Sequence, residues 1–470
     1  MRVYEVNTNL FSSYDGSGCR MIAMRGFVAY CYAAFGVTSA LTFGLVAATW
    51  TRAKGPPASK ACKALRKKYL VVYLLAFFAD WLQGPYVYAL YASYGFSEAR
   101  IAFLFIAGFG SSAVIGTFAG GLADRVGRRA CAVAYCAVYV ACCACKHSNA
   151  YGACLAGRLL GGVATSLLFS SFEAWCVSAH AKAGEAAALP DLFAAAQFGN
   201  GLAAIIAGQL AQAAVDRGAP LTRAGALYYG GDIWPFDLSA LALVACGVAC
   251  VSTWDENYGD RERPRRWRRA VGDALEGRAL LCGAASSTFE SAMYIFVFLW
   301  TPALAGADEP PEGLIFSTFM VCVMGGSCLA KGGGARRFAA NSAAAALSLG
   351  AAAALDDRRW KLLAFLVFEV CVGCYWPLVG AIKARVVPEE SRAAVYSLYR
   401  VPLNACVVAV LLARAASRRA QFLVCAGLLA ASAAAGLALA RAERGEDAPR
   451  LTGDVAINAE PLLASAGAPR

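Results

Sequence analysis

The chain has little charge and almost no histidine, and these shortages exclude several classes of protein. Only 16% of its 470 residues are charged, 59% are hydrophobic and the mean hydropathy is +0.53, which is too apolar for a soluble globular protein. With only two histidines, no zinc-type spacing and no serine–histidine–aspartate constellation is present. No phosphate-binding loop of the Gly-x-x-x-x-Gly-Lys-Ser/Thr type occurs. We therefore expect neither an enzyme nor a nucleotide-driven pump, and no metal or cofactor.

What the chain does contain is a series of long apolar stretches, most of them near the roughly 20 residues that a membrane helix needs. Most of the nineteen cysteines lie inside these stretches, where cysteine behaves as a small hydrophobic residue. The alanine-rich stretch 338–355 is the least hydrophobic. The sequence predicts an all-α integral membrane protein with thirteen helices, near residues 26–50, 69–93, 99–122, 130–146, 151–179, 190–215, 236–254, 279–303, 313–330, 338–355, 361–384, 391–413 and 420–441.

The net charge of +12 is distributed as a membrane protein requires, and it does not indicate nucleic-acid binding. Basic residues concentrate in 51–68 and 261–278, which flank predicted helices, whereas the acidic loop 305–313 has no lysine or arginine. The positive-inside rule then places the N-terminus outside and the C-terminus in the cytosol, although the basic loops 356–361 and 414–420 fall outside. The arginines around Trp267 suit contact with anionic lipid, so membrane lipid is an expected partner.

The order of apolar and polar stretches predicts two six-helix halves and one extra N-terminal membrane helix. That extra helix is too long and too far from the start for a cleaved signal peptide, so we expect an anchor or a packing element. The predicted units are residues 1–50 (extracellular N-terminus and extra helix), 51–68 (basic cytoplasmic linker), 69–254 (first half), 255–278 (second basic cytoplasmic linker), 279–441 (second half) and 442–470 (disordered cytoplasmic tail).

A short glycine-rich and basic loop joins the predicted helices 99–122 and 130–146. Its carboxylate, Asp124, is placed to accept hydrogen bonds from a helix N-terminus or to pair with an arginine. The arginines fix the loop on the cytoplasmic side. We single out this loop as a candidate gating element, with Gly120, Asp124, Arg125, Gly127, Arg128 and Arg129.

Five charged residues lie near the middle of predicted membrane helices, where each costs at least about 2.5–3.5 kcal/mol if it faces lipid. Two are arginines, Arg158 and Arg400, which can either clamp an oxyanion between the halves or form structural salt bridges. The three carboxylates, Asp80, Glu290 and Glu369, are candidate proton carriers, with a structural role as the alternative for each. A further carboxylate, Glu173, lies nearer the cytoplasmic end, and we expect it to pair with Arg125 or Arg128 in a gate.

The segment after Asp80 combines a helix break with side chains suited to a binding cavity. Gly84-Pro85 interrupts the helix near the bilayer centre, and Gln83 can donate hydrogen bonds from the same face as Asp80. Tyr86 and Tyr88 are expected either to line the cavity or to pack. A faint internal repeat sets Asp80 on Glu290, Tyr86 on Phe296, Val87 on Val297 and Tyr88 on Phe298.

The loop Gly120–Arg129 resembles the loop between helices 2 and 3 of the major facilitator superfamily. Gly-Arg-Leu-Leu-Gly-Gly around Arg158 is similar to the fourth-helix motif of that superfamily, with Gly161 where glutamine is usual. The longer strings together resemble one branch, the molybdate-anion transporter family. They are Ala-Asp-Trp-Leu-Gln-Gly-Pro-Tyr (79–86), Leu-Phe-Ser-Ser-Phe-Glu-Ala-Trp (168–175), Trp-Asp-Glu-Asn-Tyr (254–258), Phe-Glu-Ser-Ala-Met-Tyr-Ile-Phe-Val-Phe-Leu-Trp-Thr-Pro (289–302) and Tyr-Arg-Val-Pro (399–402).

This resemblance implies a secondary active transporter that takes up molybdate, a tetrahedral oxyanion, by alternating access, with proton coupling as one means of accumulation. We expect a monomer in the plasma membrane. Two alternatives stay open from the residues themselves. One is a carrier for another small solute such as a sugar or an organic anion. The other is a receptor or scaffold that keeps the transporter fold without transport.

Overall fold

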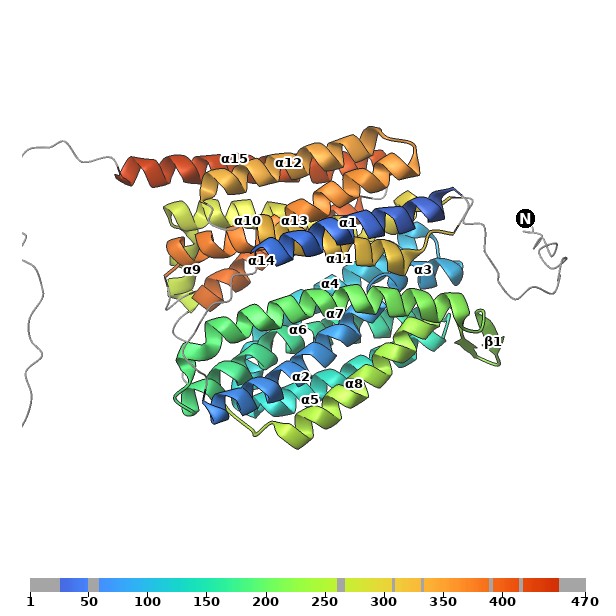
Figure 1. The fold of residues 1–470 in the computed structure, drawn as a ribbon, viewed down its shortest axis with the longest axis horizontal. Coiled ribbons are helices and arrows are strands. Elements are labelled where there is room, and N and C mark those ends of the chain that lie inside the picture. Colours follow the sequence, from blue (N-terminus) through green and yellow to red (C-terminus); the bar gives the residue numbers. More distant parts are fainter. Residues whose placement is uncertain are drawn as a thin grey trace, which may run out of the picture.

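The computed structural model describes residues 26–49, 59–259, 267–306, 309–330, 334–388, 392–413 and 417–447, and these fold almost entirely into helices (Figure 1). The helices are α1 (Phe27–Thr49), α2 (Lys60–Gln83), α3 (Tyr86–Ser93), α4 (Glu98–Val126), α5 (Arg128–Ala144), α6 (Tyr151–Lys182), α7 (Leu189–Arg217), α8 (Trp234–Thr253), α9 (Trp267–Leu275), α10 (Gly277–Leu304), α11 (Glu312–Leu329), α12 (Ala335–Ala354), α13 (Arg358–Val386), α14 (Arg392–Leu412) and α15 (Arg418–Asp447). One small hairpin pairs β1 (Thr222–Ala224) with β2 (Leu227–Tyr229).

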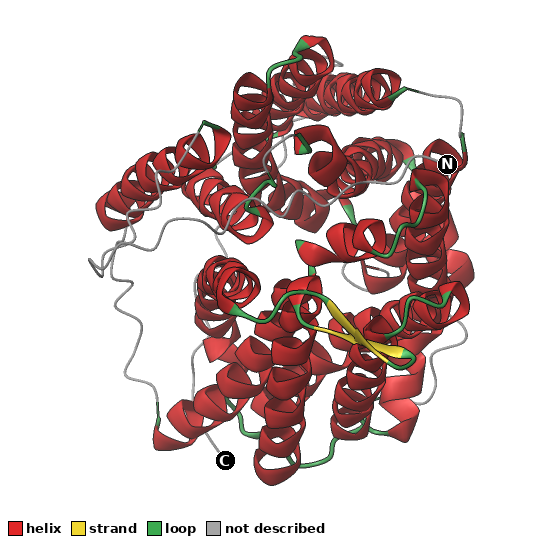
Figure 2. Ribbon diagram, turned by 90° about the vertical axis from the view of Figure 1, so that its right-hand side faces the viewer, coloured by secondary structure: helices red, strands yellow, loops and turns green. Residues whose placement is uncertain are grey.

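The helices form two bundles, as the sequence predicts. Helices in corresponding positions make the same contacts within each bundle. In the first, α2 packs on α7 and α8, α4 on α6, and α5 on α6 and α8. In the second, α10 packs on α14 and α15, α11 on α13, and α12 on α13 and α15. Figure 1 shows the first bundle below the second, and Figure 2 views them nearly end-on. The same packing order in both bundles confirms two six-helix halves.

Among the described residues, eleven helical segments are long and apolar enough to cross a membrane. The alanine-rich α12 is not one of them, and α14 contains only the shorter apolar segment Leu398–Leu412. Both helices nevertheless occupy their places in the second bundle, because α12 packs on α13 and α15 while α14 packs on α10. Neighbouring helices thus supply the burial that their own sequences supply poorly.

The extra helix α1 lies along α11 and contributes little to the core. The Thr42 hydroxyl donates to the Val321 carbonyl of α11 at 3.2 Å, directly beside Gly325, where a Cβ would come within 2.7 Å of the Thr42 oxygen. Phe35 and Val46 of α1 pack against a small cluster that Ile205 of α7 shares with Val321 and Met324 of α11. The extra helix therefore lies beside the place where the two halves meet.

The structure differs from the sequence-based boundaries at both linkers. Ser59 caps α2 by accepting from the Cys62 backbone N–H at 3.0 Å, so residues 60–68, predicted as part of a linker, are helical. The expected break at Gly84-Pro85 is present, because α2 ends at Gln83 and α3 begins at Tyr86. The second linker contains α9, a helix we did not predict. Predictions for residues 1–25, 50–58, 260–266 and 448–470 lie outside the described residues.

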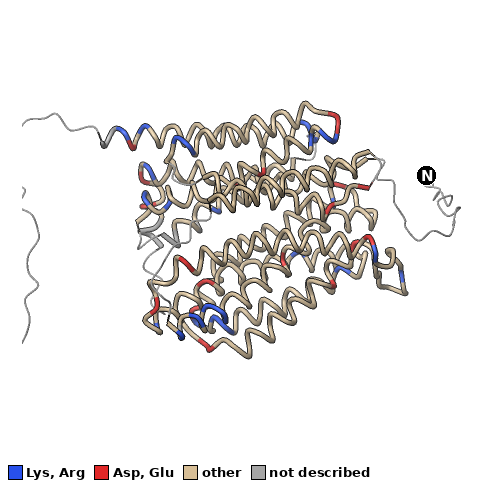
Figure 3. Tube along the Cα trace, in the orientation of Figure 1, with Lys and Arg blue, Asp and Glu red and all other residues tan. Residues whose placement is uncertain are grey.

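The two halves are joined toward one end of the bundle, which we call the Glu98 end; the opposite end, with the Asp124 loop, is the Arg128 end. Helices α7 and α11 cross there so closely that a Cβ on Gly208 would lie 2.6 Å from the Gly313 carbonyl oxygen. Gln212 of α7 accepts from the Gly313 backbone N–H at 2.9 Å, and Arg418 of α15 pairs with Glu98 of α4. Most charged residues lie near the two ends of the bundle (Figure 3).

Candidate functional site

The central feature of the site is Tyr294 on α10, around which charged residues from both halves gather. The Arg400 guanidinium of α14 lies beside the Tyr294 hydroxyl, and Arg400 is exposed. Glu290 of α10 and Asp80 of α2 are negative charges that act on this hydroxyl. Phe109 of α4 packs edge-on against the Tyr294 ring at 5.4 Å, so the first half contacts this residue directly. One arginine and two carboxylates therefore surround a tyrosine at the interface of the halves.

Glu290 is held by two groups from α13. The Tyr375 hydroxyl donates to its Oε1 at 2.6 Å, and the Lys383 ammonium donates to the same oxygen at 3.3 Å. The side chains of Lys383 and Glu290 are only 14% and 13% exposed. A partly buried carboxylate costs free energy unless it is paired, and this ion pair together with the tyrosine provides the pairing.

Asp80 has a comparable environment in the first half. The Tyr139 hydroxyl of α5 donates to its Oδ1 at 2.5 Å. Helices α2 and α10 occupy matching places in the two bundles, and Asp80 and Glu290 each accept from a tyrosine on a neighbouring helix. The two tyrosines come from helices that do not correspond, α5 in the first half and α13 in the second.

Arg158 is turned toward α4 and does not share a partner with Arg400. Its Nε donates to the Leu104 carbonyl at 3.2 Å, and its guanidinium lies 4.6 Å from the centre of the Phe105 ring. A Cβ on Gly108 would come within 2.8 Å of Arg158, so the glycine makes room for the arginine. From Phe105 a row of ring contacts continues through Phe109 to Tyr294, beside which Arg400 lies.

Three residues near the helix break were predicted to bind substrate, and their contacts are with residues other than Tyr294 and Arg400. Gln83 donates to the Ser239 hydroxyl of α8 at 2.9 Å and is 4% exposed, so its amide points into the first half. Tyr86 donates to Gln212 at 3.0 Å, and Tyr88 packs edge-on against Phe298 at 5.5 Å. In this conformation both tyrosines pack in the contact between the halves at the Glu98 end.

At the Arg128 end, Asp124 and Arg128 form a buried ion pair at 2.7 Å. Pairing with an arginine, one of the two roles expected for Asp124, is observed. Arg128 also donates to the Ala174 carbonyl at 3.1 Å and to the Asn257 side chain at 3.4 Å, tying α6 and the segment after α8 to the loop. Glu173, expected to pair with Arg125 or Arg128, is exposed, and Arg128 pairs with Asp124 instead. Arg125 and Gly120 lie on α4, and Gly120 has open space around it.

Glu256 caps the N-terminus of α5, a function that the sequence did not reveal. Its carboxylate accepts from the backbone N–H groups of Arg129 and Ala130 at 2.8 and 3.0 Å. Negative charge at a helix N-terminus is stabilised by the unpaired N–H groups and the helix dipole. Gly127 has a φ of 117°, and a Cβ there would lie 2.5 Å from the Glu256 carboxyl carbon. Only glycine fits this turn.

Glu369, the third predicted proton carrier, is 7% exposed and lies beside Cys322 of α11. No ion pair of Glu369 is found among the described residues. It is not among the groups that act most strongly on the Tyr294 hydroxyl, which are Arg400, Glu290 and Asp80.

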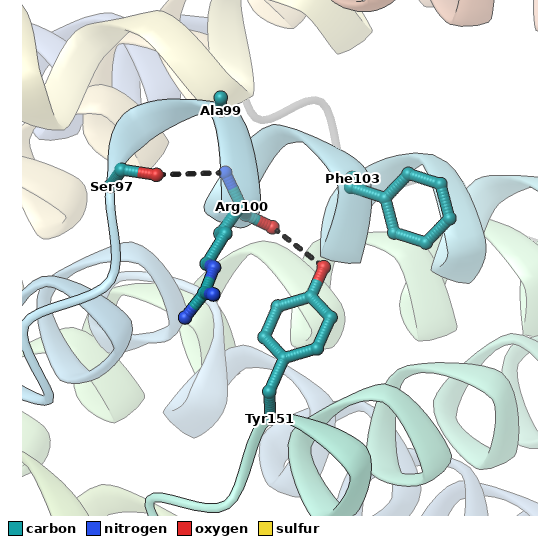
Figure 4. Close-up of a pocket in the computed structure, with 5 residues that line it drawn as sticks. All are labelled: Ser97, Ala99, Arg100, Phe103 and Tyr151. Atoms are coloured by element: carbon teal, nitrogen blue, oxygen red, sulfur yellow. Dashed lines mark hydrogen bonds between the residues drawn. The ribbon is translucent and has the colours of Figure 1, made fainter.

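A surface pocket of about 460 Å³ opens at the Glu98 end, at the start of α4 and α6 (Figure 4). Its polar groups are engaged locally: Ser97 accepts from the Arg100 backbone N–H at 3.4 Å, and Tyr151 donates to the Arg100 carbonyl at 3.3 Å. The Arg100 guanidinium stacks over the Tyr151 ring at 5.6 Å. These contacts begin α4 and join it to α6, so the pocket lies apart from the charges around Tyr294.

Sequence reasoning missed Tyr294, Lys383, Tyr139 and Tyr375 as parts of the site. Tyr294 follows Glu290 by four residues and so shares its helix face, a spacing that could have indicated it. Lys383 lies near the end of a predicted helix, where the positive-inside rule already explains a lysine. Its contact with Glu290 spans 93 residues of sequence, and no local pattern encodes that distance.

Comparison with known proteins finds relatives that are described as transporters. Residues 27–355 match a family described as sugar transporters with 12 TM. The molybdate-anion transporter of Xenopus tropicalis is 35% identical over 377 residues, covering 76% of this chain and 79% of the relative. That of Danio rerio is 32% identical over 462 residues, covering 85% and 92%.

Solved structures share the fold. The POT family transporter PepTSo matches with a TM-score of 0.65 at 10% identity, covering 82% of this chain and 99% of that one. A D-xylose-proton symporter matches with a TM-score of 0.61 at 13% identity, covering 79% and 96%. At such low identity these matches concern the arrangement of helices alone.

Proposed function

The chain belongs to the molybdate-anion transporter family of the major facilitator superfamily, and on that premise we propose that it carries molybdate across a membrane by alternating access. The protein is a membrane transporter, not an enzyme. The observation that carries the choice of substrate class is the exposed Arg400 beside the Tyr294 hydroxyl. A guanidinium offers a planar fork of N–H donors, and a phenol adds one more donor, which together suit a tetrahedral oxyanion.

The charges around Tyr294 suit a doubly negative substrate that travels with protons. Asp80 and Glu290 contribute two negative charges, and Lys383 and Arg400 two positive charges, so the four groups sum to zero when all are ionised. Protonation of both carboxyls leaves +2, which balances the two negative charges of molybdate. Without protons, moving a dianion inward against about 100 mV costs about 4.6 kcal/mol. Symport of two protons removes that electrical cost.

We propose that the Arg128 end faces the cytosol, with the N-terminus outside and the C-terminus inside, in the plasma membrane. The basic loop around Arg128 and Arg129 supports this orientation. Since the halves are joined at the Glu98 end, the conformation described here is then the one closed to the outside. We propose that the chain functions as a monomer, because each of the two halves supplies charges to the one site.

The decisive measurement is accumulation of molybdate at nanomolar external concentration in cells that lack their own uptake, with and without excess sulfate. Asp124→Asn, which weakens the buried ion pair with Arg128, serves as the cycling control. We expect accumulation that resists sulfate and is lost in the variant. Absence of accumulation with the protein confirmed at the cell surface would refute molybdate transport.

The family description names sugars, so a sugar is the competitor to include in the same assay. Unlabelled xylose or glucose in large excess should leave molybdate accumulation unchanged, because an uncharged sugar does not need the cations Arg400 and Lys383. Inhibition by sugar, together with sugar uptake that survives Arg400→Gln, would favour the sugar carrier over the anion carrier.

A further inference from the structure

We propose that Lys383 is a second anion-binding group, and that the Glu290 carboxyl controls it: ionised Glu290 holds the lysine away from substrate, and protonated Glu290 releases it. The ligand is the same tetrahedral dianion as in the proposed function, on which this inference rests. In this mechanism Arg400 and Tyr294 bind the anion at all times, whereas Lys383 binds it only when a proton is present.

The contact between Lys383 and Glu290 is suited to exchange. The Nζ–Oε1 distance is 3.3 Å, longer than the 2.7–2.9 Å that is usual for a charge-assisted hydrogen bond. The shorter bond to the same oxygen, at 2.6 Å, comes from Tyr375. The lysine therefore neutralises Glu290 without being its closest donor, and the ammonium can change partner while Tyr375 stays in place.

The geometry puts the two cations on one face of α10. Glu290 and Tyr294 are four residues apart, which sets their Cβ atoms about 5–6 Å from each other. The Lys383 ammonium donates to Glu290, and the Arg400 guanidinium lies beside the Tyr294 hydroxyl. The Lys383 ammonium also lies 5.9 Å from the centre of the Tyr399 ring, and Tyr399 directly precedes Arg400. A lysine released from Glu290 is thus within about one helical turn of an anion on Arg400.

Proton transfer drives the exchange. A proton from water on the side where the site is open binds a Glu290 carboxyl oxygen and removes the negative charge that attracted Lys383. The ammonium then donates to an oxygen of the anion, which Arg400 and Tyr294 already hold. On the other side of the membrane the proton leaves Glu290 to water, the ion pair re-forms and the anion loses one of its cations. The ion pair seen here then represents the carrier after release.

Among the described groups around Glu290, the other carboxylate is Asp80 across the interface, which accepts from Tyr139. Of the other helices packed on α10, α15 places Ser432 against Ala285, and α3 places Tyr88 against Phe298. The charged residues of α9 precede Glu290 by more than three helical turns along the chain. The titratable and charged groups near Glu290 are Cys282 and Tyr294 on α10, Tyr375 and Lys383 on α13, Tyr396, Tyr399 and Arg400 on α14, and Asp80 across the interface.

The test measures binding of molybdate to the full-length protein in lipid nanodiscs at an acidic pH of about 5.5 and a slightly alkaline pH of about 7.5. The variants are Lys383→Gln and Glu290→Gln. Arg385→Gln is the matched control, since Arg385 lies on the same helix but pairs with Glu443 and is half-exposed. Thermal unfolding confirms that each variant is folded. If Lys383→Gln does not fold, the double variant Glu290→Gln/Lys383→Gln takes its place. It removes both members of the ion pair, so no carboxylate is left unpaired by the loss of the lysine.

We expect the wild-type protein to bind more tightly at the lower pH, and Glu290→Gln to bind tightly at both. Lys383→Gln should bind about tenfold more weakly than the wild type at the lower pH, the usual effect of one charge-assisted hydrogen bond. Wild-type affinity at the lower pH in Lys383→Gln would overturn the inference while leaving molybdate transport intact. A wild-type protein that binds no molybdate at either pH would instead refute the proposed function itself.

Discussion

The ring of Tyr88 packs edge-on against the ring of Phe298, with centroids 5.5 Å apart and planes at 68°. Tyr88 belongs to α3 of the first half and Phe298 to α10 of the second, and the internal repeat sets these two residues on each other. Residues related by an approximate two-fold axis contact each other only where they lie close to that axis. The pair therefore lies near the axis of the two halves, on the side where they are joined.

The Tyr88–Phe298 pair should stabilise the conformation closed at the Glu98 end. Replacing Phe298 by leucine keeps an apolar side chain and removes its edge-on contacts with Tyr88 and Phe105 of the first half, each worth about 0.5–1.5 kcal/mol. We expect backbone hydrogen exchange in α3 to become about twofold to tenfold faster, because this conformation becomes less populated. Phe319→Leu is the control, since Phe319 packs on Phe296 and Trp300 within the second half. Equal exchange in both variants would contradict the assignment.

Gly127 offers a test of the loop at the Arg128 end. Its φ of 117° and the 2.5 Å approach of a built Cβ to Glu256 mean that Gly127→Ala both strains the backbone and displaces the cap of α5. Such strain costs about 1–3 kcal/mol, and loss of a cap about 1 kcal/mol more. We expect a lower unfolding temperature and reduced uptake.

Gly120→Ala, in the same motif, is the matched control because nothing lies within 4 Å of the built Cβ. It should unfold close to the wild-type temperature. If both alanine variants were equally stable, the contact between Gly127 and Glu256 would not constrain the loop as described.

The fold could be predicted from the sequence because membrane helices depend on composition over some 20 residues, and the Gly84-Pro85 break depends on two. The pairing of Asp124 with Arg128 was also within reach, since the two residues are only four apart in the sequence, on either side of the turn at Gly127. Boundaries in polar segments were harder. Residues 60–68 resemble a basic loop in composition, but the Ser59 cap and helix-favouring lysines and alanines extend α2 through them.

The site was predicted less well, because its contacts join distant helices. Arg400 and Glu290 were found as charges in apolar surroundings, a signal that needs no partner. The partners Tyr375 and Lys383 are ordinary residues in sequence and gain their meaning only when α13 packs beside α10. Gln83 is the opposite case, a side chain that stands out in the sequence and has its partner inside the protein. Its polarity suggested a cavity, whereas the Ser239 hydroxyl satisfies its amide inside the first half.

Arg400 should be required for uptake in a way that charge alone does not restore. Arg400→Gln removes the donors beside Tyr294, and hydrogen bonds to charged groups contribute about 1.5–3 kcal/mol, so we expect the KM for molybdate to rise about tenfold or more. Arg400→Lys keeps the charge but loses the planar fork, and should recover only part of the affinity. Initial rates of uptake measure both. Arg419→Gln, an exposed residue at the start of α15, should behave like the wild type.

The carboxylates can be separated by function with isosteric amides. Glu369 is buried beside Cys322, outside the charged neighbours of Tyr294, so its carboxyl is expected to remain neutral through the transport cycle. Glu369→Gln should therefore keep molybdate accumulation within about twofold of the wild type.

Glu290→Gln should behave in the opposite way. The amide at position 290 resembles a glutamate that is always protonated. The variant should therefore still exchange internal for external molybdate but no longer accumulate molybdate against a gradient. Accumulation and exchange measured side by side in proteoliposomes distinguish the two carboxyls. If Glu369→Gln abolished accumulation but spared exchange, Glu369 would be the residue that carries the coupling proton. Among the charged groups around Tyr294, only Asp80 would then take up a proton.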